Sequence, residues 1–264
     1  MFIIRKASQM ARKAALILAI SIISFFFASC GNKDNFENSS AYDVFMKAKE
    51  YFDDEDYLQA QKLFDMIKLQ YPASQFADDA QFYLAKSNFE RGEFILAAYN
   101  FGTVRRVYPN SEYAKDALYQ KAMCFYELSP TYDRDQEYTI QAINALTEFQ
   151  VIYGADSLAK ICDGYIDELR EKLGRRDYSI AFLYQKVYYY QSALIYYDSV
   201  IENFADTKYY EPAFFGKIEV LFLMKQNEEC LSVIDAYQKN FPNGEFIDQV
   251  NDYEKQIKEF KSTE

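Results

Sequence analysis

The sequence predicts an all-α protein built as a stack of helix pairs, and three observations lead to that prediction. The phrase YPASQFADDA at 71–80 returns as YPNSEYAKDA at 108–117, an interval of 37 residues from Tyr71 to Tyr108. Glycine and proline are scarce, with 8 and 5 copies in 264 residues, which argues against a turn-rich β-sandwich. Tyrosine and phenylalanine are abundant, with 25 and 23 copies, so we expect aromatic seams between long helices. A fixed period in this range indicates stacked units rather than one compact core.

Within each unit, small residues recur in two places. Ala48, Ala85 and Ala122 are spaced by 37 residues, and Ala181 takes the same place later in the chain. A second position is filled by Ala60, Ala97, Ala142, Ala193 and Cys230. Small side chains in the middle of two adjacent helices allow the close antiparallel packing of a helix pair, at an axial separation of about 8–10 Å.

The first unit places Ala48, Tyr51, Ala60, Phe64 and Pro72 in a spacing that resembles the tetratricopeptide repeat. The resemblance implies a right-handed superhelical solenoid of five tetratricopeptide-like helix pairs, with a long helix between repeats 3 and 4. We place the repeats at about 41–74, 78–111, 115–155, 156–207 and 211–244, followed by a C-terminal helix at 245–260, within a domain spanning 42–264.

The phrase shared by 71–80 and 108–117 is interpreted as punctuation between repeats. The proline ends the second helix of one repeat, the following serine is expected to be the N-cap of the next helix, and the aspartates favour its positive N-terminal end. Tyr153-Gly154 follows Tyr108-Pro109 by 45 residues, 8 more than the period, and this surplus falls in SPTYDRDQ at 129–136. The helical stretch 157–173 is expected to extend the first helix of the fourth repeat to about Tyr188, with Gly174 as a candidate kink.

The first 29 residues have the features of a signal peptide. Four basic residues precede an uncharged apolar run from Ala14 to Ala28, which is shorter than the roughly 20 residues needed to span a bilayer. The sequence FASC at 27–30 resembles the bacterial lipobox, although Phe27 stands where leucine is usual. We therefore expect Cys30 to be lipidated and residues 30–41 to form a tether; a plain signal peptide with an incidental cysteine is the alternative.

Composition also narrows the function. Removing residues 1–29 takes away four positive charges, so the net charge falls from −11 to −15, which disfavours nucleic acid as a partner. Histidine is absent, so the commonest general base and metal ligand is missing, and we expect neither an enzyme nor a cofactor. The run DDED at 53–56 lacks the alternating ligands and glycine of a calcium loop, and no metal is expected there. Cys124, Cys162 and Cys230 are expected to be small buried hydrophobes.

A stripe on the first helices of repeats 1 to 3 is the candidate binding groove. Counted from the alanines, it holds Phe45, Lys49, Phe52, Phe82, Lys86, Phe89, Tyr119, Met123 and Tyr126. Aromatic rings with lysines between them suit an extended or unfolded polypeptide that carries a carboxylate. The alternative is that these aromatics pack between neighbouring first helices and that the lysines are only solvated.

Three stretches resemble the BamD family of the outer-membrane β-barrel assembly machinery: FDMIKLQYPASQFADDA at 64–80, RDQ at 134–136 and DELREKLGRRDYSIAFLYQK at 167–186. The resemblance implies a non-enzymatic lipoprotein on the periplasmic face of the outer membrane. It also implies that the chain binds a BamA-type barrel subunit through its POTRA domain and receives unfolded outer-membrane protein precursors. In that family the N-terminal repeats are associated with substrate or partner segments, and the C-terminal repeats with BamA.

Other classes of protein stay open at this point. One is a different periplasmic tetratricopeptide scaffold, such as a coordinator of envelope constriction or of the cell wall. A glycan-capturing lipoprotein is disfavoured because sugar sites prefer tryptophan platforms and this chain has no tryptophan. An enzyme is the third class.

Overall fold

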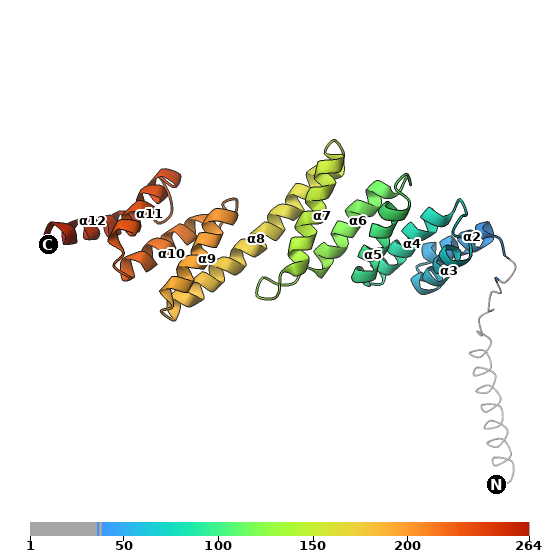
Figure 1. Ribbon diagram of the computed structural model, residues 1–264, viewed down its shortest axis with the longest axis horizontal. Helices are drawn as coiled ribbons and strands as arrows, with labels where there is room; N and C mark the ends of the chain where they lie inside the picture. The colour runs from blue at the N-terminus through green and yellow to red at the C-terminus, as the bar shows by residue number, and fades with distance from the viewer. Residues whose placement is uncertain (1–35, 37–38, 264) are drawn as a thin grey trace, which may run out of the picture. The chain divides into compact units, whose positions relative to one another are not determined.

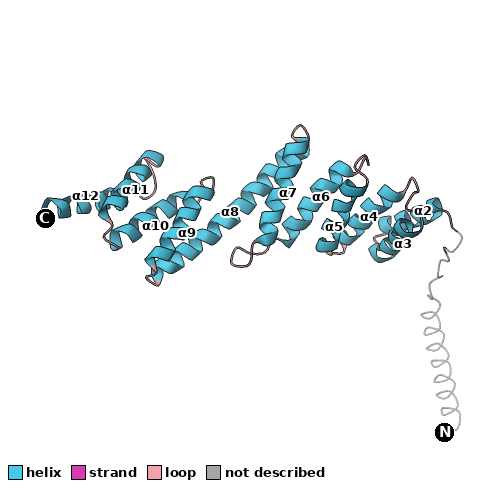
Figure 2. Ribbon diagram, viewed as in Figure 1, coloured by secondary structure: helices cyan, strands magenta, loops and turns pink. Residues whose placement is uncertain are grey.

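The computed structural model describes residue 36 and residues 39–263, and all the regular secondary structure in that part of the chain is helical (Figure 2). The predicted signal peptide, Cys30 and most of the tether lie outside the described residues. The described helices belong to one compact unit that begins at Ala41. Within residues 36 and 39–263, no helix has the length and apolar content required to cross a membrane.

The helices follow one another as antiparallel pairs, each packed mainly on its neighbours in sequence (Figure 1). The pairs are α2 (Ala41–Asp53) with α3 (Tyr57–Gln70), α4 (Ala77–Glu90) with α5 (Phe94–Val107), α6 (Ala114–Leu128) with α7 (Glu137–Tyr153), α8 (Ser157–Lys186) with α9 (Tyr190–Asn203), and α10 (Tyr210–Leu223) with α11 (Asn227–Asn240); α12 (Ile247–Thr263) follows. The prediction of an all-α fold of five helix pairs is confirmed.

The small residues lie where the period predicted them. The alanines of the first position and the alanines and cysteine of the second position are all fully buried. Large buried side chains fill the space between the two helices of each pair, among them Phe64, Phe101, Phe149 and Tyr197. The close approach allowed by the small residues therefore lets each pair bury an aromatic seam.

In the turns between repeats, the predicted helix end before each proline is confirmed, whereas the predicted serine N-cap is wrong. Tyr71 and Tyr108 are the C-caps of α3 and α5, and a proline follows each. Ser74 and Ser111, however, are not N-caps, because α4 and α6 begin three residues after each serine, at Ala77 and Ala114.

Each serine instead accepts a hydrogen bond inside the turn. The backbone N–H of Phe76 donates to Ser74 Oγ at 3.3 Å, and that of Tyr113 donates to Ser111 Oγ at 3.2 Å. A serine can bond the N–H two residues ahead of it in a turn as readily as it can cap a helix. The predicted aspartates do lie in the first turns of α4 and α6.

The turns inside four of the helix pairs share one backbone conformation. Glu55, Gly92, Tyr188 and Lys225 all have φ between 59° and 72°. The first two and the last two are each 37 residues apart, so these are equivalent positions of the repeat. In the third pair, the longer segment between Leu128 and Glu137 takes the place of this turn.

Helix α8 is 30 residues long and runs unbroken through Gly174. A Cβ on Gly174 would lie 3.0 Å from Thr207 Oγ1 and 3.3 Å from the Cβ of Phe204. Because Gly174 has no side chain, the turn after α9 can pack closely against α8 at this point. The sequence had suggested a kink here instead.

The three cysteines of the described chain are buried and free. Burial raises the pKa of Cys124 to about 12 and that of Cys230 to about 11. As predicted, these residues are small members of the core. A thiol with a raised pKa is also a poor nucleophile at neutral pH.

Candidate functional site

The predicted stripe forms an aromatic cluster between α2 and α4. The ring of Tyr83 lies 5.3 Å from the ring of Phe52 and 6.3 Å from that of Phe45, measured between centroids. Phe45 also stacks on Phe76 at 5.2 Å. Phe45, Phe52 and Tyr83 are all partly exposed, so the cluster is both a packing contact and a surface.

Two lysines border this cluster. Lys49 Nζ is 4.1 Å from the centroid of Tyr83, and Lys86 Nζ is 5.4 Å from the centroid of Phe52. Lys49 also forms an ion pair with Asp53 at 2.8 Å, whereas Lys86 has no ion pair within the described part of the chain. Ammonium groups held over ring faces gain cation–π stabilisation and keep N–H groups for a further acceptor. We refer to Phe45, Lys49, Phe52, Tyr83 and Lys86 as the first seam.

The second repeat contributes less surface than the stripe suggested. Phe82 is only 6% exposed, and its ring stacks on that of Tyr113 at 4.4 Å. Phe89 is partly exposed and packs edge-on against Phe94 of its own helix pair at 5.2 Å. Phe82 therefore offers almost no area to a bound peptide.

In the third repeat the tyrosines of the stripe contact α7 and α8 and stay partly exposed. Tyr119 packs on Phe149 at 5.6 Å, and Tyr126 packs on Tyr165 of α8 at 4.8 Å. The Tyr126 hydroxyl donates to Glu168 at 2.7 Å, and this bond, with burial, raises the pKa of Tyr126 to about 12. Burial raises the pKa of Tyr119 to about 12 as well. Met123, between these two tyrosines, is partly exposed.

Tyr83 is the residue of the first seam that sequence reasoning missed. The equivalent positions in the first and third repeats are Met46 and Gln120, so the repeat period carried no aromatic signal there. The neighbouring Phe82 fitted the 37-residue period and was therefore predicted to line the groove. Adjacent helical residues point about 100° apart, and only the packing of α2 on α4 shows which of the two faces the seam.

A partly buried polar network joins the first two helix pairs. The Glu93 carboxylate accepts hydrogen bonds from Gln61 at 2.7 Å, from Asn88 at 2.8 Å and from Arg91 at 3.0 Å. Burial opposes the ionisation of Glu93, but the hydrogen bonds from Asn88, Arg91 and Gln61 outweigh it and lower its pKa. The partly exposed carboxylate is thus held in its charged form by three donors.

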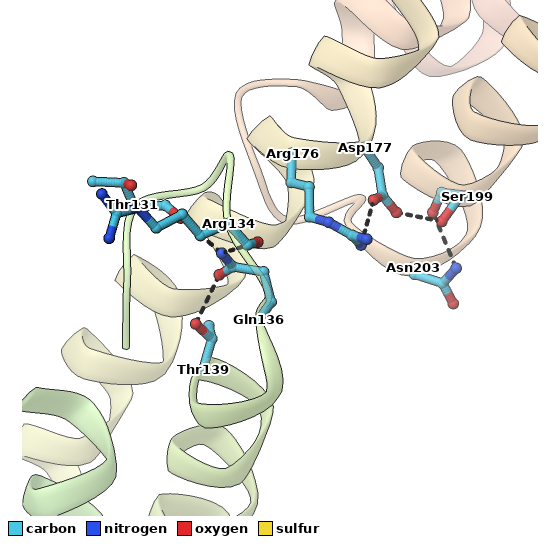
Figure 3. Close-up of polar contacts among 8 residues, drawn as sticks. All are labelled: Thr131, Arg134, Gln136, Thr139, Arg176, Asp177, Ser199 and Asn203. Carbon is cyan, nitrogen blue, oxygen red and sulfur yellow. Dashed lines mark hydrogen bonds and ion pairs between the residues drawn. The ribbon is translucent and has the colours of Figure 1, made fainter. Parts of the chain in front are cut away.

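The segment 129–136, which breaks the repeat period, is fixed by Gln136 (Figure 3). The Gln136 side chain is 4% exposed, and its Nε2 donates to the carbonyl oxygens of Thr131 and Arg134 at 2.8 and 2.9 Å. The Thr139 hydroxyl donates to Gln136 Oε1 at 2.7 Å. The RDQ triplet therefore has a structural role, in which the glutamine closes the loop.

A second polar group in Figure 3 joins α8 to α9. Ser199 Oγ donates to the buried Asp177 at 2.7 Å, and Arg176 forms an ion pair with the same carboxylate at 3.2 Å. Lys172, one turn earlier, donates to Ser129 at 2.8 Å, and burial lowers its pKa. These contacts tie the long helix both to the loop between α6 and α7 and to the helix after it.

The described part of the chain shows no group of three or more cysteine, aspartate or glutamate side chains placed to hold a metal ion. The DDED run has a local role in which Asp56 caps α3, its side chain accepting from the N–H of Gln59 at 3.3 Å.

A protein-family model described as "YfiO: Outer membrane lipoprotein" matches residues 37–230. Curated protein sequences give no match.

Among solved structures, a tetratricopeptide repeat protein from Parabacteroides merdae is similar at 15% identity, covering 82% of this chain and 88% of that one, with a TM-score of 0.40. The tetratricopeptide protein TTC0263 from Thermus thermophilus is similar at 14% identity over 81% and 97% of the two chains, with a TM-score of 0.35. The P58(IPK) tetratricopeptide domain is similar at 14% identity over 83% and 59%, with a TM-score of 0.43.

Proposed function

The chain belongs to the YfiO family of outer membrane lipoproteins, and from this premise we propose that it is a non-enzymatic scaffold of the outer-membrane β-barrel assembly machinery. It binds a BamA-type barrel subunit through the POTRA domain of that subunit, and it binds unfolded segments of outer-membrane proteins. Lipid on Cys30 holds it at the periplasmic face of the outer membrane.

The first seam is the observation that supports peptide binding. Its rings are partly exposed, and the ammonium groups of Lys49 and Lys86 lie 4.1 and 5.8 Å from the centroid of Tyr83. An extended segment with an apolar side chain and a nearby carboxylate can place the side chain on the rings and the carboxylate on Lys86. The predicted groove residues Phe89, Tyr119 and Tyr126 would extend the contact only along its rim, since their rings already pack on other helices.

A second candidate is another periplasmic scaffold, such as a coordinator of envelope constriction or of the cell wall. Purification of the tagged chain from detergent-solubilised envelope separates the two candidates. We expect co-recovery of a large β-barrel protein with POTRA domains. Recovery of only septal or cell-wall proteins would overturn the proposal.

The peptide-binding part is tested by the double variant Lys49→Gln/Lys86→Gln. Its affinity for unfolded segments of barrel precursors should fall roughly fivefold per lysine, because each ammonium loses a charge-assisted contact. The matched control is Lys62→Gln, an exposed lysine on α3 whose ammonium bonds only Gln59 within the described chain. Binding can be measured by fluorescence anisotropy of labelled peptides.

The two parts of the proposal fail separately. Equal weakening by Lys62→Gln would show that binding depends on net charge rather than on the first seam. Loss of the co-purified barrel subunit in the double variant would show that the seam binds that subunit instead of peptide. Thermal unfolding of both variants checks that the fold is retained.

A further inference from the structure

The turn between α8 and α9 presents large apolar side chains to solvent. Val187 is 47% exposed, Tyr188 78% and Tyr189 66%, and Leu183, one turn earlier on α8, is 61% exposed. We refer to these four residues as the aromatic tip. Tyr188 and Tyr189 make edge contacts with Tyr190 and Tyr184, at 6.2 and 6.4 Å between ring centroids, and most of their surface stays in solvent.

The equivalent turns show that folding does not require these residues. The same three positions hold Asp54, Glu55 and Asp56 in the first pair, Arg91, Gly92 and Glu93 in the second, and Met224, Lys225 and Gln226 in the fifth. All four turns place the central residue at positive φ. A bulky tyrosine is strained there while glycine is not, so Tyr188 is less suited to the backbone than its counterpart Gly92.

The charge pattern around the aromatic tip also departs from the rest of the chain. The protein carries 40 acidic residues, yet none lies between Asp177 and Asp198. Lys186 is the one charged residue in that interval, and its ammonium lies 4.9 Å from the ring of Phe182. The turn therefore carries no acidic residue of its own to repel an anionic bilayer, although Glu219 of α10 accepts a hydrogen bond from Gln185 at 3.2 Å.

This composition suits the boundary between lipid headgroups and acyl chains. Tyrosine rings favour that boundary because their apolar body enters it while the hydroxyl stays hydrated, and a neighbouring lysine reaches the phosphates with its ammonium. Valine and leucine at the same tip add apolar area that gains by leaving water. The family to which the chain belongs is one of outer membrane lipoproteins, so a bilayer is the surface that such a tip would meet.

We propose that the aromatic tip inserts into the lipid–water interface of a bilayer and gives the helical unit a membrane contact of its own, independent of the N-terminal segment. Val187, Tyr188 and Leu183 enter the interface, and Lys186 faces the headgroup phosphates. The proposal does not depend on what binds the first seam.

The absence of tryptophan from the chain makes the test simple, because one introduced tryptophan is the sole indole fluorophore. The full-length protein with Tyr188→Trp is reconstituted into vesicles of phosphatidylethanolamine and phosphatidylglycerol that carry brominated acyl chains. Lys225→Trp is the matched control, because Lys225 is the equivalent turn residue of the next helix pair and has the same backbone conformation. We expect roughly a twofold loss of Tyr188→Trp fluorescence to the bromines and little loss for Lys225→Trp.

A second variant replaces the three turn residues of the aromatic tip and keeps the backbone conformation of the turn. Val187→Arg, Tyr188→Gly and Tyr189→Glu together copy Arg91-Gly92-Glu93, which already form this turn in the same protein. With Leu183→Trp as the reporter, we expect the triple substitution to reduce bromine quenching severalfold. Thermal unfolding should show no loss of stability, since glycine relieves the positive-φ strain.

Three results would overturn the proposal. Equal quenching at positions 188 and 225 would mean that the whole unit lies on the surface without a specific tip. A tryptophan at 188 that escapes the bromines but is shielded from aqueous acrylamide would mean that the tip is covered by protein, either a partner or a second copy. Unchanged quenching after the triple substitution would show that the aromatic tip is not the inserting element.

Discussion

At the junction between the first and second helix pairs, the next first helix is α4, of 14 residues, and the aromatic stripe beside Lys49 and Lys86 stays partly exposed. At the junction between the third and fourth pairs, the next first helix is α8, of 30 residues, and its first half contacts Tyr126 through Tyr165 and Glu168. The stripe is partly exposed at both junctions, and at the second one the longer helix adds a ring contact and a hydrogen bond to Tyr126.

The largest expected loss of stability comes from removing the buried Phe149 ring, which lies at the second of these junctions. Phe149→Ala should lower the free energy of unfolding by about 3–5 kcal/mol, because this ring is fully buried and also supports Tyr119. Urea denaturation measures the loss. The control Leu69→Ala, at a position 81% exposed, should change stability by less than about 0.5 kcal/mol. Equal effects of the two substitutions would show that α7 and α8 do not form a packed junction.

A smaller loss is expected from the loop that precedes α7. Gln136→Ala should cost about 1–3 kcal/mol of unfolding free energy, since the carbonyl oxygens of Thr131 and Arg134 lose their donor. A comparable substitution inside the second helix pair is Asn100→Ala, because Asn100 of α5 donates to the buried Asn88 of α4 at 2.9 Å. Gln141→Ala, whose amide bonds only the exposed Glu137 within the described chain, serves as the control. A Gln136 variant as stable as the Gln141 variant would contradict the structural role of the RDQ triplet.

The ion pair between α8 and the turn after α9 makes the stability of the fold depend on pH. Arg170 donates to both oxygens of Asp206 and to the carbonyl of Asn203, and its hydrogen bond lowers the pKa of Asp206. Because the pKa of Asp206 is lower in the folded than in the unfolded state, its ionised form stabilises the fold at pH values above the unfolded-state pKa. This stabilisation is lost as the pH falls through the lower, folded-state pKa.

Asp206→Asn should therefore cost about 0.5–1 kcal/mol at neutral pH, a modest value because both side chains are partly exposed. The difference from the unsubstituted protein should vanish at acid pH. Parallel urea titrations at neutral and acid pH measure it. A constant difference at both pH values would show that the aspartate acts through packing rather than through its charge.

The smallest effect distinguishes the two glycines of the long helix. Gly164→Ala should raise the unfolding free energy by about 0.5–1 kcal/mol, because no atom lies within 4 Å of the added Cβ and alanine is the better helix former. Gly174→Ala should gain less or lose stability, since its Cβ would meet Thr207 and Phe204. Equal gains at both positions would mean that α8 does not need the close approach at Gly174.

Much of the fold followed from the spacing of residues. Ala48, Ala85 and Ala122 marked the buried faces of the first helices, and the segment after Ser157 was expected to be one long helix, as α8 is. Local hydrogen bonding was harder to predict. A serine after a proline fits both an N-cap and a turn, and the energies of the two are similar, so the sequence did not show that α4 starts only at Ala77.

The candidate site was predicted in outline. Phe45, Lys49, Phe52 and Lys86 do come together, but Tyr83 completes the first seam where Phe82 was expected, and Phe82 is in the core. The period locates a helix face to within about one residue, which is 100° of rotation. Which neighbour of a given position reaches the facing helix depends on how the two helices cross.

The sequence by itself determined the repeat period, the small residues at which helices approach, the burial of the three cysteines and the acidic balance of the surface. These properties depend on residue type and spacing along one chain, so they need no knowledge of neighbouring elements. Only the tertiary structure decided that Tyr83 completes the first seam, that Tyr165 and Glu168 of α8 contact Tyr126, and that the side chains of the aromatic tip are exposed. The exposure of a side chain depends on every element that packs near it, and no single helix contains that information.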